Sequence, residues 1–406
     1  MKIFFYCTYP NQSNGYARIG NNITNYLASK ENMEIYYFGI THSKETFVDR
    51  FIHPKIKLIN VREESPSKNS YGDDLIMTKI QEIQPDIVFL YNDIMVLSRM
   101  INQINLIPSR NFKVFTYIDL VYPFENQQLI YFIHQTTDKF FVFSNCWKKH
   151  LEIDYSIPSE KIFILKHGLD ISRIYPMDKE KARSYFGFHP DDIIFLNLNR
   201  NTHRKAIDIT IRSFLSLLKR FPERQNHLKL FLNGLEEPSS YHNLEIIQIE
   251  CKRLNLDFSF VSNHLILINK NIISEYELNI LYNACDFGIN TCMGEGFGLC
   301  CLEHASVGKP QIMTNVGGLS DIFDKEHSQL VDPSVEIYTP TALESTGGYL
   351  SIGSVKDFTD AMESYLVQKE KAERDGNYYK NLIPVVYDWQ LILEEFYVYH
   401  LKNQVV

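Results

Sequence analysis

The feature that most constrains the fold is the alternation of short apolar runs with polar turns and helical patterns. Residues 2–9 form an apolar run, residues 10–15 a polar turn, and a helical pattern extends from Ala17 to about Lys30. Strand, turn and helix in this order open a βαβ unit, and its repetition predicts a parallel sheet covered by helices on both faces. In the first half, further strands are expected at Glu34–Phe38, Asp86–Leu90, Lys113–Ile118, Lys139–Phe143 and Lys161–Leu165.

A polar stretch interrupts this pattern at Asp170–Pro190 and indicates an interdomain link. The pattern then resumes with a strand at Ile193–Leu198, a loop at Arg200–Lys205 and an amphipathic helix at Asp208–Arg220. A chain of 406 residues is long enough for two domains, so the second half is expected to be Rossmann-like as well. Its later strands are expected at Leu228–Leu232, Leu265–Ile268, Phe287–Ile289, Gln311–Met313 and Ser328–Val331.

Two segments near the end have a different composition. Residues 333–353 are rich in Thr, Ser, Pro and Gly, which predicts a long loop. Two helices are expected after it, and the last of them runs from about Trp389 to Leu401.

A glycine-rich turn flanked by two carboxylates is the main chemical signal. Residues 294–299 read Gly-Glu-Gly-Phe-Gly-Leu, and Glu303 follows after Cys300-Cys301-Leu302. Without side chains at Gly294, Gly296 and Gly298, backbone N–H groups can point at an anion, and a helix starting near Leu299 adds its positive end. Glu303 would then lie roughly 6–8 Å further along the helix, about the reach from a diphosphate to a ribose.

The motif resembles that of retaining glycosyltransferases of the family-4 type. Seven residues separate Glu295 from Glu303, and Gly308-Lys309-Pro310 and Gly317-Gly318-Leu319 follow in the order typical of that family. The resemblance implies the α/β fold called GT-B, in which two Rossmann-like domains face each other across a cleft and a C-terminal helix crosses back to the N-domain. The expected domains are residues 1–175 with helix 386–406 on the acceptor side, and residues 176–385 on the donor side.

The resemblance also assigns the cations that stabilise the leaving diphosphate. Arg200 and Lys205 follow the first strand of the second domain, where α/β sheets bind ligands, and they match the family's Arg and Lys. A guanidinium fork and an ammonium group could replace a metal ion, so neither metal nor cofactor is expected. Two departures accompany the match: Ala206 stands where glycine is usual, and Arg204 is an additional cation.

The remaining donor contacts are carried over in the same way. Glu295 is placed near the sugar hydroxyls, Glu303 on the ribose hydroxyls, and Gly296, Phe297, Gly298 and Leu299 around the diphosphate. Retention is expected to follow from front-face attack, in which the departing phosphate takes the acceptor's proton. Double displacement through Glu295 is the less favoured route.

In the N-domain the resemblance is weaker. Only Gly15 remains of the family's paired-glycine turn, and its backbone is expected to approach the donor phosphate. Asp119 ends a strand and is a candidate catalytic residue facing the cleft, although a role in a turn or helix cap fits equally well. Ile118 replaces the family's histidine, and His167 is interpreted as a structural residue at the domain junction.

Composition limits the partners. A net charge of −8 argues against nucleic-acid binding, because such binding depends on clustered Lys and Arg. The N-terminal apolar run is too short for a signal peptide, and seven cysteines without paired spacing predict reduced thiols, so a cytoplasmic location is expected. Peripheral membrane contact stays open, although no basic amphipathic helix stands out.

The expected reaction is therefore transfer of a hexose from a nucleotide-diphosphate sugar to a hydroxyl of a glycan, lipid-linked or protein acceptor. Base contacts are expected from backbone and variable loops, including residues 269–273. A non-catalytic nucleotide-sugar binding protein of the same fold is the main alternative, and a sugar phosphorylase or epimerase is a third. A dehydrogenase and a P-loop enzyme are disfavoured, because neither glycine-rich segment has the Gly-x-Gly-x-x-Gly or P-loop spacing.

Overall fold

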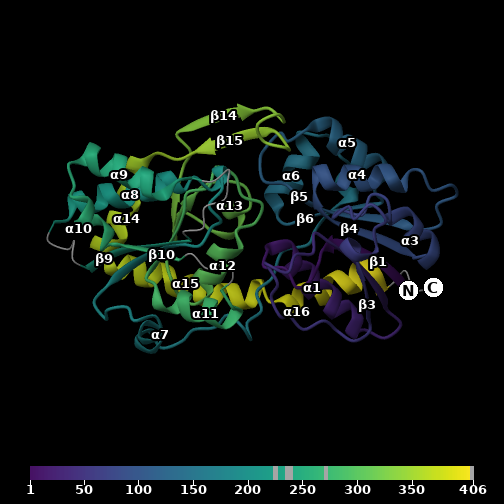
Figure 1. Ribbon diagram of the computed structural model, residues 1–406, viewed down its shortest axis with the longest axis horizontal. Helices are drawn as coiled ribbons and strands as arrows, with labels where there is room; N and C mark the ends of the chain where they lie inside the picture. The colour runs from purple at the N-terminus through teal and green to yellow at the C-terminus, as the bar shows by residue number, and fades with distance from the viewer. Residues whose placement is uncertain (223–226, 234–240, 269–272, 403–406) are drawn as a thin grey trace. The chain divides into compact units, whose positions relative to one another are not determined.

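The computed structural model divides the chain into two units, each with its own parallel sheet (Figure 1). It describes residues 1–222, 227–233, 241–268 and 273–402. Unit 1 comprises Met1–Gly168, Thr339–Tyr349 and Trp389–Val406, and unit 2 comprises Leu169–Tyr338 and Leu350–Asp388. Both sheets have the strand order of a Rossmann-like domain, which confirms the predicted fold class of each half.

The sheet of unit 1 has the order β3-β2-β1-β4-β5-β6-β7, and all its strand pairs are parallel. In Figure 1, α4 and α5 lie on one side of this sheet and α1 on the other, so its central strands are buried on both faces. Burial on both faces explains why these strands are almost continuously apolar. The strands are β1 (Lys2–Thr8), β2 (Glu34–Ile40), β3 (Ile56–Asn60), β4 (Ile87–Asp93), β5 (Lys113–Asp119), β6 (Lys139–Val142) and β7 (Ile162–Ile164).

Some helices of unit 1 begin where a polar side chain accepts a hydrogen bond from one of the first backbone N–H groups. Asn14 Oδ1 accepts from the N–H of Ala17 at 2.9 Å and caps α1, and Asp93 does the same for Val96 at the start of α4. The helices are α1 (Gly15–Ser29), α2 (Val61–Glu64), α3 (Ile76–Ile83), α4 (Ile94–Ile104), α5 (Gln127–Thr136) and α6 (Asn145–Ile153).

The chain's last helix packs on unit 1, as predicted. Helix α16 (Trp389–Phe396) continues as a π-helical turn over Tyr397–Leu401. The ring of Phe396 lies 5.4 Å from that of Phe141 and 6.0 Å from that of Phe89, both in buried strands. Lys30, the residue that follows α1, forms an ion pair with Glu394 at 2.6 Å. The C-terminal segment is thus part of the core of unit 1.

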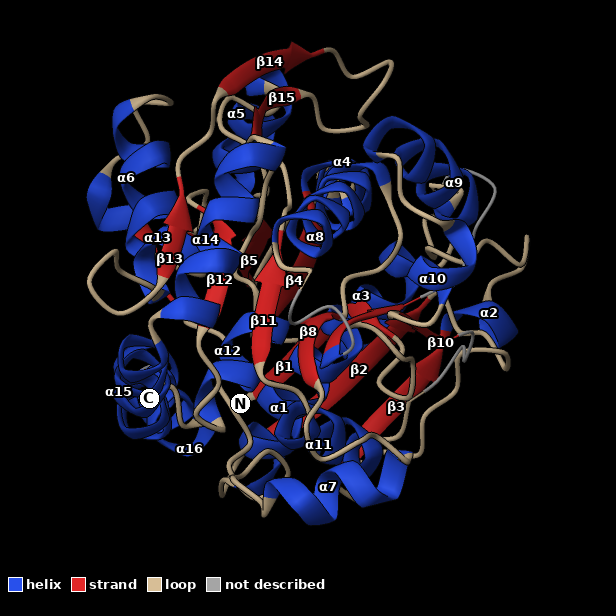
Figure 2. Ribbon diagram, turned by 90° about the vertical axis from the view of Figure 1, so that its left-hand side faces the viewer, coloured by secondary structure: helices blue, strands red, loops and turns tan. Residues whose placement is uncertain are grey.

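The sheet of unit 2 has the order β10-β9-β8-β11-β12-β13. Helices α8 and α14 lie together on one face, and α11, α12 and α15 lie on the other (Figure 2). The strands are β8 (Ile193–Asn197), β9 (Leu228–Asn233), β10 (Leu265–Ile268), β11 (Phe287–Asn290), β12 (Gln311–Thr314) and β13 (Gln329–Val331). The helices are α7 (Lys179–Phe186), α8 (Ile207–Arg220), α9 (Asn243–Leu254), α10 (Phe258–Ser262), α11 (Glu275–Ala284), α12 (Leu299–Ser306), α13 (Leu319–Ile322), α14 (Val355–Val367) and α15 (Lys369–Val386).

The segment expected to be an interdomain link is part of unit 2. It contains α7, whose Ala182 packs in a buried cluster with Ile280 and Ala284 of α11. The first boundary between the units lies at residues 168/169, ahead of the expected 175/176, and unit 2 extends through Asp388. The polar composition that suggested a link reflects the exposed face of a short amphipathic helix.

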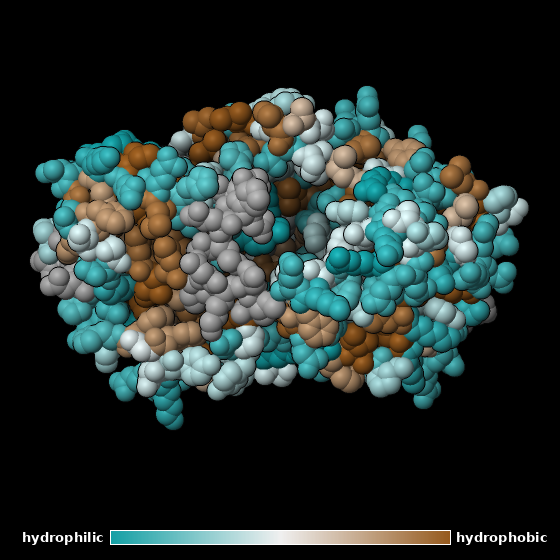
Figure 3. Space-filling view, viewed as in Figure 1, coloured by the Kyte–Doolittle hydropathy of each residue, from teal (hydrophilic) through white to brown (hydrophobic). Residues whose placement is uncertain are grey.

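Residues 333–353 form a β-hairpin and not the long loop expected. Strands β14 (Val335–Thr339) and β15 (Gly348–Ile352) pair, and the tip at residues 339–349 belongs to unit 1. Within unit 1, the N–H of Tyr349 donates to the carbonyl of Pro123 at 2.9 Å, and that of Asn126 donates to Thr346 at 2.8 Å. Large side chains on β14 are exposed: Val335, Ile337 and Tyr338. Figure 3 shows hydrophobic surface, in brown, along the top, where Figure 1 draws β14 and β15.

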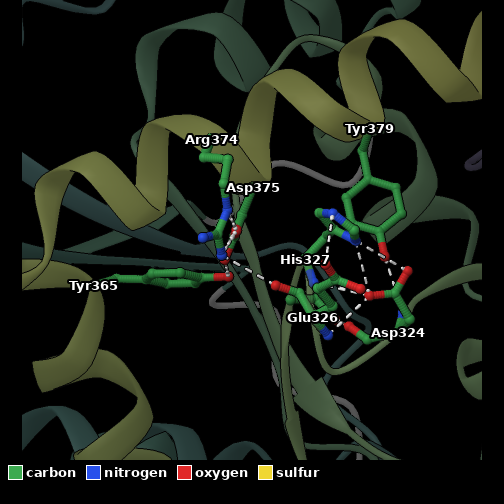
Figure 4. Close-up of polar contacts among 8 residues, drawn as sticks. Asp324, Glu326, His327, Tyr365, Arg374, Asp375 and Tyr379 are labelled. Atoms are coloured by element: carbon green, nitrogen blue, oxygen red, sulfur yellow. Dashed lines mark hydrogen bonds and ion pairs between the residues drawn. The ribbon is translucent and has the colours of Figure 1, made fainter.

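A polar network fastens α15 to the loop before β13 (Figure 4). The carboxylate of Asp375 is fully buried and accepts hydrogen bonds from Tyr365 Oη at 3.0 Å and from the guanidinium of Arg374. Farther along the same helix, Tyr379 Oη accepts from the N–H of Asp324 at 2.9 Å. Because each buried polar group has a partner, this network serves to position α15.

Candidate active site

A short basic turn follows the carboxyl end of β8 in unit 2. Residues His203–Lys205 form one 3₁₀ turn, and Ala206 then adopts φ +45° immediately before α8 begins. A positive φ is the conformation that glycine adopts most easily, which explains why glycine is usual at this position. The carbonyl of Ala206 accepts from Thr291 Oγ1 at 2.9 Å, and this contact ties the turn to the segment after β11.

Lys205 and Glu295 form the centre of the site. The ammonium of Lys205 is paired with Glu295 Oε2, and both side chains are about nine-tenths buried. Arg204 lies 3.7 Å from Glu295 Oε1 and donates to the carbonyl of Gly294 at 2.6 Å. Two cations therefore surround one carboxylate, so the cluster carries a net positive charge.

The electrostatics of Glu295 follow from this arrangement. Burial alone would raise its pKa, but Lys205 and Arg204, with a hydrogen bond from Asn290, bring the pKa down to about 2. Glu295 is therefore ionised throughout the physiological pH range.

The glycine turn that follows Glu295 is packed too closely for larger residues. Gly298 has φ +97°, and a Cβ at that position would lie 2.3 Å from the side chain of Leu319. Gly318 donates its N–H to the carbonyl of Glu295 at 3.1 Å, and its own Cβ would lie 2.2 Å from the carbonyl oxygen of Gly296. The two glycine segments noted in the sequence are thus in direct contact, and one supports the other.

Helix α12 starts at Leu299, as predicted, with Gly298 as its N-cap. Gly296, Phe297 and Gly298 lie directly before it, so the N-terminal amides of α12 adjoin the turn that Arg204 and Lys205 border. Positive helix ends and cations in one place favour an anion. Glu303 lies one turn into α12, is buried, and accepts a hydrogen bond from Tyr282 Oη at 2.8 Å.

Arg200 is not part of the ion cluster. Its side chain is exposed in the loop after β8, and within the described part of the chain no ion pair joins it to Glu295. Arg204, the additional cation, is the arginine that lies beside Glu295. Sequence spacing could not distinguish the two arginines, because Arg200 lies in the loop after β8 whereas Arg204 lies within the 3₁₀ turn, and the turn sets the direction of its side chain.

In unit 1, Gly15 and Asp119 lie at the carboxyl edge of the sheet. Gly15 is the exposed first residue of α1, and Asp119 ends β5. Asp119 accepts a hydrogen bond from Tyr16 Oη at 2.5 Å and lies beside Asp93, its register partner on β4. Ile118 is buried, so the position of the family's histidine belongs to the core in this chain.

His167 is enclosed by aromatic side chains at the end of the first segment of unit 1. Its ring lies 4.2 Å from Phe143 and 5.6 Å from Tyr117. Burial, with a smaller effect of Arg18, lowers its pKa to about 3, so the ring stays neutral. These contacts fit the structural role expected for it.

Three site neighbours were not singled out in the sequence: Tyr16, Tyr282 and Asn290. Tyr16 and Tyr282 act through contacts between separate elements, so no local motif marks them. Asn290 ends β11 and hydrogen-bonds Glu295 a few residues later, but a single asparagine is not a recognisable motif. Most of the segment expected to contact the base, residues 269–272, lies outside the described residues.

Sequence similarity to other proteins covers parts of this chain. The chain is 27% identical over 172 residues to D-inositol 3-phosphate glycosyltransferase 2 of Catenulispora acidiphila, which is 41% of this chain and 37% of that protein. It is 25% identical over 213 residues to mannosylfructose-phosphate synthase of Agrobacterium fabrum, or 49% of this chain and 44% of that protein. The chain thus matches less than half the length of these relatives.

Solved structures with the same fold cover nearly the whole chain. Sucrose-phosphate synthase from Thermosynechococcus elongatus superposes with a TM-score of 0.74 at 15% identity, over 98% of this chain and 97% of that one. HepE from Anabaena, solved with UDP and glucose, gives a TM-score of 0.72 at 13% identity, over 98% of both chains. With two Rossmann-like sheets and a terminal helix on the first, the fold is of the GT-B class.

The family can be stated more narrowly. The sequence pattern of the family described as Glycosyl transferases group 1 matches residues 178–381, half of the chain and nearly all of unit 2. The chain belongs to this family of glycosyltransferases.

Proposed function

We propose that this protein transfers a hexose from a nucleotide-diphosphate sugar to an acceptor hydroxyl, with retention and without a metal ion. The observation that carries the proposal is the Arg204, Lys205 and Glu295 cluster beside the N-terminus of α12. One carboxylate between two cations leaves positive charge for a diphosphate, and the glycine turn provides backbone N–H groups.

Each group has a distinct role in this proposal. Lys205 and Arg204 stabilise the charge that builds on the leaving diphosphate, and exposed Arg200 reaches the same group when donor binds. Glu295 accepts hydrogen bonds from the sugar hydroxyls while it holds Lys205 in place. Glu303, oriented by Tyr282, accepts from the ribose hydroxyls. The departing phosphate oxygen takes the proton of the attacking hydroxyl on the same face.

The acceptor side is proposed to involve unit 1. Gly15 and Asp119 lie at the carboxyl edge of its sheet, the edge at which α/β proteins bind ligands. Asp119 would position the acceptor, a hydroxyl of a glycan, a lipid-linked sugar or a protein. We place the reaction in the cytoplasm, with peripheral membrane contact for a lipid-linked acceptor. None of the described helices is both long and apolar enough to cross a membrane.

A panel of UDP-, GDP- and ADP-sugars tests the donor half of the proposal. One donor should raise the melting temperature of the purified protein by mass action and should slowly release its nucleotide. Binding without any release, with or without candidate acceptors, would identify a non-catalytic binding protein instead. A requirement for free phosphate would indicate a phosphorylase.

Two carboxylate variants separate chemistry from binding. Glu295→Gln should lower kcat about 100-fold or more with donor affinity nearly unchanged, because the charge acts mainly in the transition state. Glu303→Ala should weaken nucleotide binding and change kcat less. Glu180→Gln, an exposed carboxylate on α7, is the matched control and should change neither. Equal losses of kcat and affinity in both site variants would contradict these roles.

A further inference from the structure

Two histidines and an aspartate meet at the amino edge of the unit 2 sheet, at the end opposite to the candidate active site. His189 and Asp192 precede β8, and His227 precedes β9. One ligand atom from each side chain lies within 4.8 Å of the other two. Lys205, by contrast, follows the carboxyl end of β8, so the length of the strand separates the two places.

Strand register creates this group. Ile193 of β8 is the direct partner of Leu228 of β9, so the residues just before them, Asp192 and His227, are also neighbours across the sheet edge. His189 joins them because the chain turns back on itself between residues 189 and 192. The N–H of Asp192 donates to the carbonyl of His189 at 3.1 Å, and the N–H of His189 donates to Asp192 Oδ2 at 3.2 Å.

A buried arginine, Arg183, donates hydrogen bonds to the backbone of the turn at residues 189–192. Arg183 is 2% exposed and donates to the carbonyls of His189 at 3.2 Å and of Asp192 at 2.6 Å. Its guanidinium also pairs with Asp286 at 2.7 Å. Arg183 is thus engaged with backbone oxygens and another carboxylate, while the Asp192 carboxylate is buried beside two imidazoles.

We propose that His189, Asp192 and His227 form a binding site for a divalent transition-metal ion such as zinc. Two imidazoles and a carboxylate suit zinc, and three protein ligands leave a fourth position for water. Ligand atoms on tetrahedral zinc lie roughly 3.4 Å apart, given metal–ligand distances of about 2.1 Å. Both imidazoles are exposed and can close the remaining distance by side-chain rotation, while Asp192 is already fixed.

The ion would link the starts of β8 and β9, and so it would stabilise unit 2 without touching the reacting groups. This site is therefore independent of the metal-free transfer proposed above. Metal binding should raise the melting temperature of the protein and leave the donor-dependent nucleotide release unchanged.

Titration of the full chain, after dialysis against a chelator, tests the site. Calorimetry with zinc chloride should give one site per chain, and cobalt(II) should give the visible spectrum of a nitrogen and oxygen site. His189→Ala and His227→Ala should each weaken zinc binding roughly tenfold or more and abolish the rise in melting temperature. His242→Ala, an exposed histidine of the same unit, should behave like the unmodified protein.

Three results would overturn the proposal. They are no saturable zinc binding, unchanged affinity in both histidine variants, or a thiolate-to-cobalt charge-transfer band that places the metal on cysteine. Asp192→Asn is a third variant, but the exposed histidines decide the outcome, because the Asp192 carboxylate also accepts the hydrogen bond from the N–H of His189 that closes the turn.

Discussion

At the residue scale, two buried carboxylates illustrate how surroundings decide charge. Glu295 is ionised because two cations outweigh its burial. Glu125 in unit 1 is buried even more deeply, and the hydrogen bonds described for its carboxylate come from the backbone N–H groups of Val121 and Tyr122. Burial, aided by Asp119 and Asp93, raises the pKa of Glu125 to about 8. The folded protein therefore keeps this carboxyl protonated where an unfolded chain would release the proton.

This difference predicts a pH dependence of stability. Between about pH 4.5 and 8 the folded state binds the extra proton, so the free energy of unfolding should fall by up to about 1.4 kcal/mol per pH unit as the pH rises. Glu125→Gln should remove this contribution. The free energy of unfolding of the variant should therefore rise relative to that of the unmodified protein as the pH increases. Urea denaturation at several pH values measures the effect. Glu152→Gln, an exposed carboxylate on α6, is the control, and parallel curves for the Glu125 variant would refute the prediction.

At the element scale, the site depends on close contact between two glycine segments. Gly318 has an ordinary helical backbone conformation, so its requirement for glycine is purely steric. The atoms that a Cβ would meet are backbone atoms of Gly296 and Phe297, which cannot rotate away. A larger residue must therefore displace the turn that precedes α12.

Gly318→Ala should lower both stability, by about 1–3 kcal/mol, and nucleotide-sugar affinity, because the turn must move. Gly187→Ala is the matched comparison, because there the cost comes from backbone conformation and not from a steric clash. Gly187 has φ +70° with nothing within 4 Å of an added Cβ. The substitution should lower the free energy of unfolding by about 1 kcal/mol and leave nucleotide-sugar affinity unchanged. Denaturation and thermal shift with nucleotide sugar measure both quantities. Unchanged affinity in the Gly318 variant would contradict the supporting role of this contact.

At the scale of the whole molecule, unit 1 is assembled from three separate stretches of chain. Its core is completed by α16, which follows nearly four hundred residues after β1. Phe396 is 3% exposed and packs against Phe89 and Phe141, whereas Leu391 on the same helix is 59% exposed. The end of the chain thus contributes to the stability of the unit that its beginning forms.

Phe396→Ala should destabilise the protein by about 3–5 kcal/mol, the cost of removing a buried ring and leaving a cavity. Leu391→Ala should change the free energy of unfolding by less than about 0.5 kcal/mol, because its side chain faces solvent. Chemical denaturation of both variants provides the comparison. Similar losses in the two would show that α16 does not pack on the sheet in this way.

The strands of both sheets could be predicted where they are buried on two faces, because such strands are continuous apolar runs. β10 matches its prediction at both ends, whereas β3 was missed because its sequence, Ile-Lys-Leu-Ile-Asn, is interrupted by polar residues. The hairpin β14–β15 was hidden by a composition typical of loops, although Val335, Ile337 and Thr339 alternate as in a strand. Helix α7 was missed because the polar composition of its segment suggested a link between domains.

Local sequence alone determined the glycine turn before α12, the start of that helix and the presence of cations after β8, since each depends on residues within one short segment. Only tertiary structure decided that Arg204 and not Arg200 faces Glu295, that Tyr282 orients Glu303, and that His227 meets Asp192. The residues of each pair are at least 21 positions apart in the sequence. Strand register and packing set their distances, and neither is encoded in the spacing of one motif.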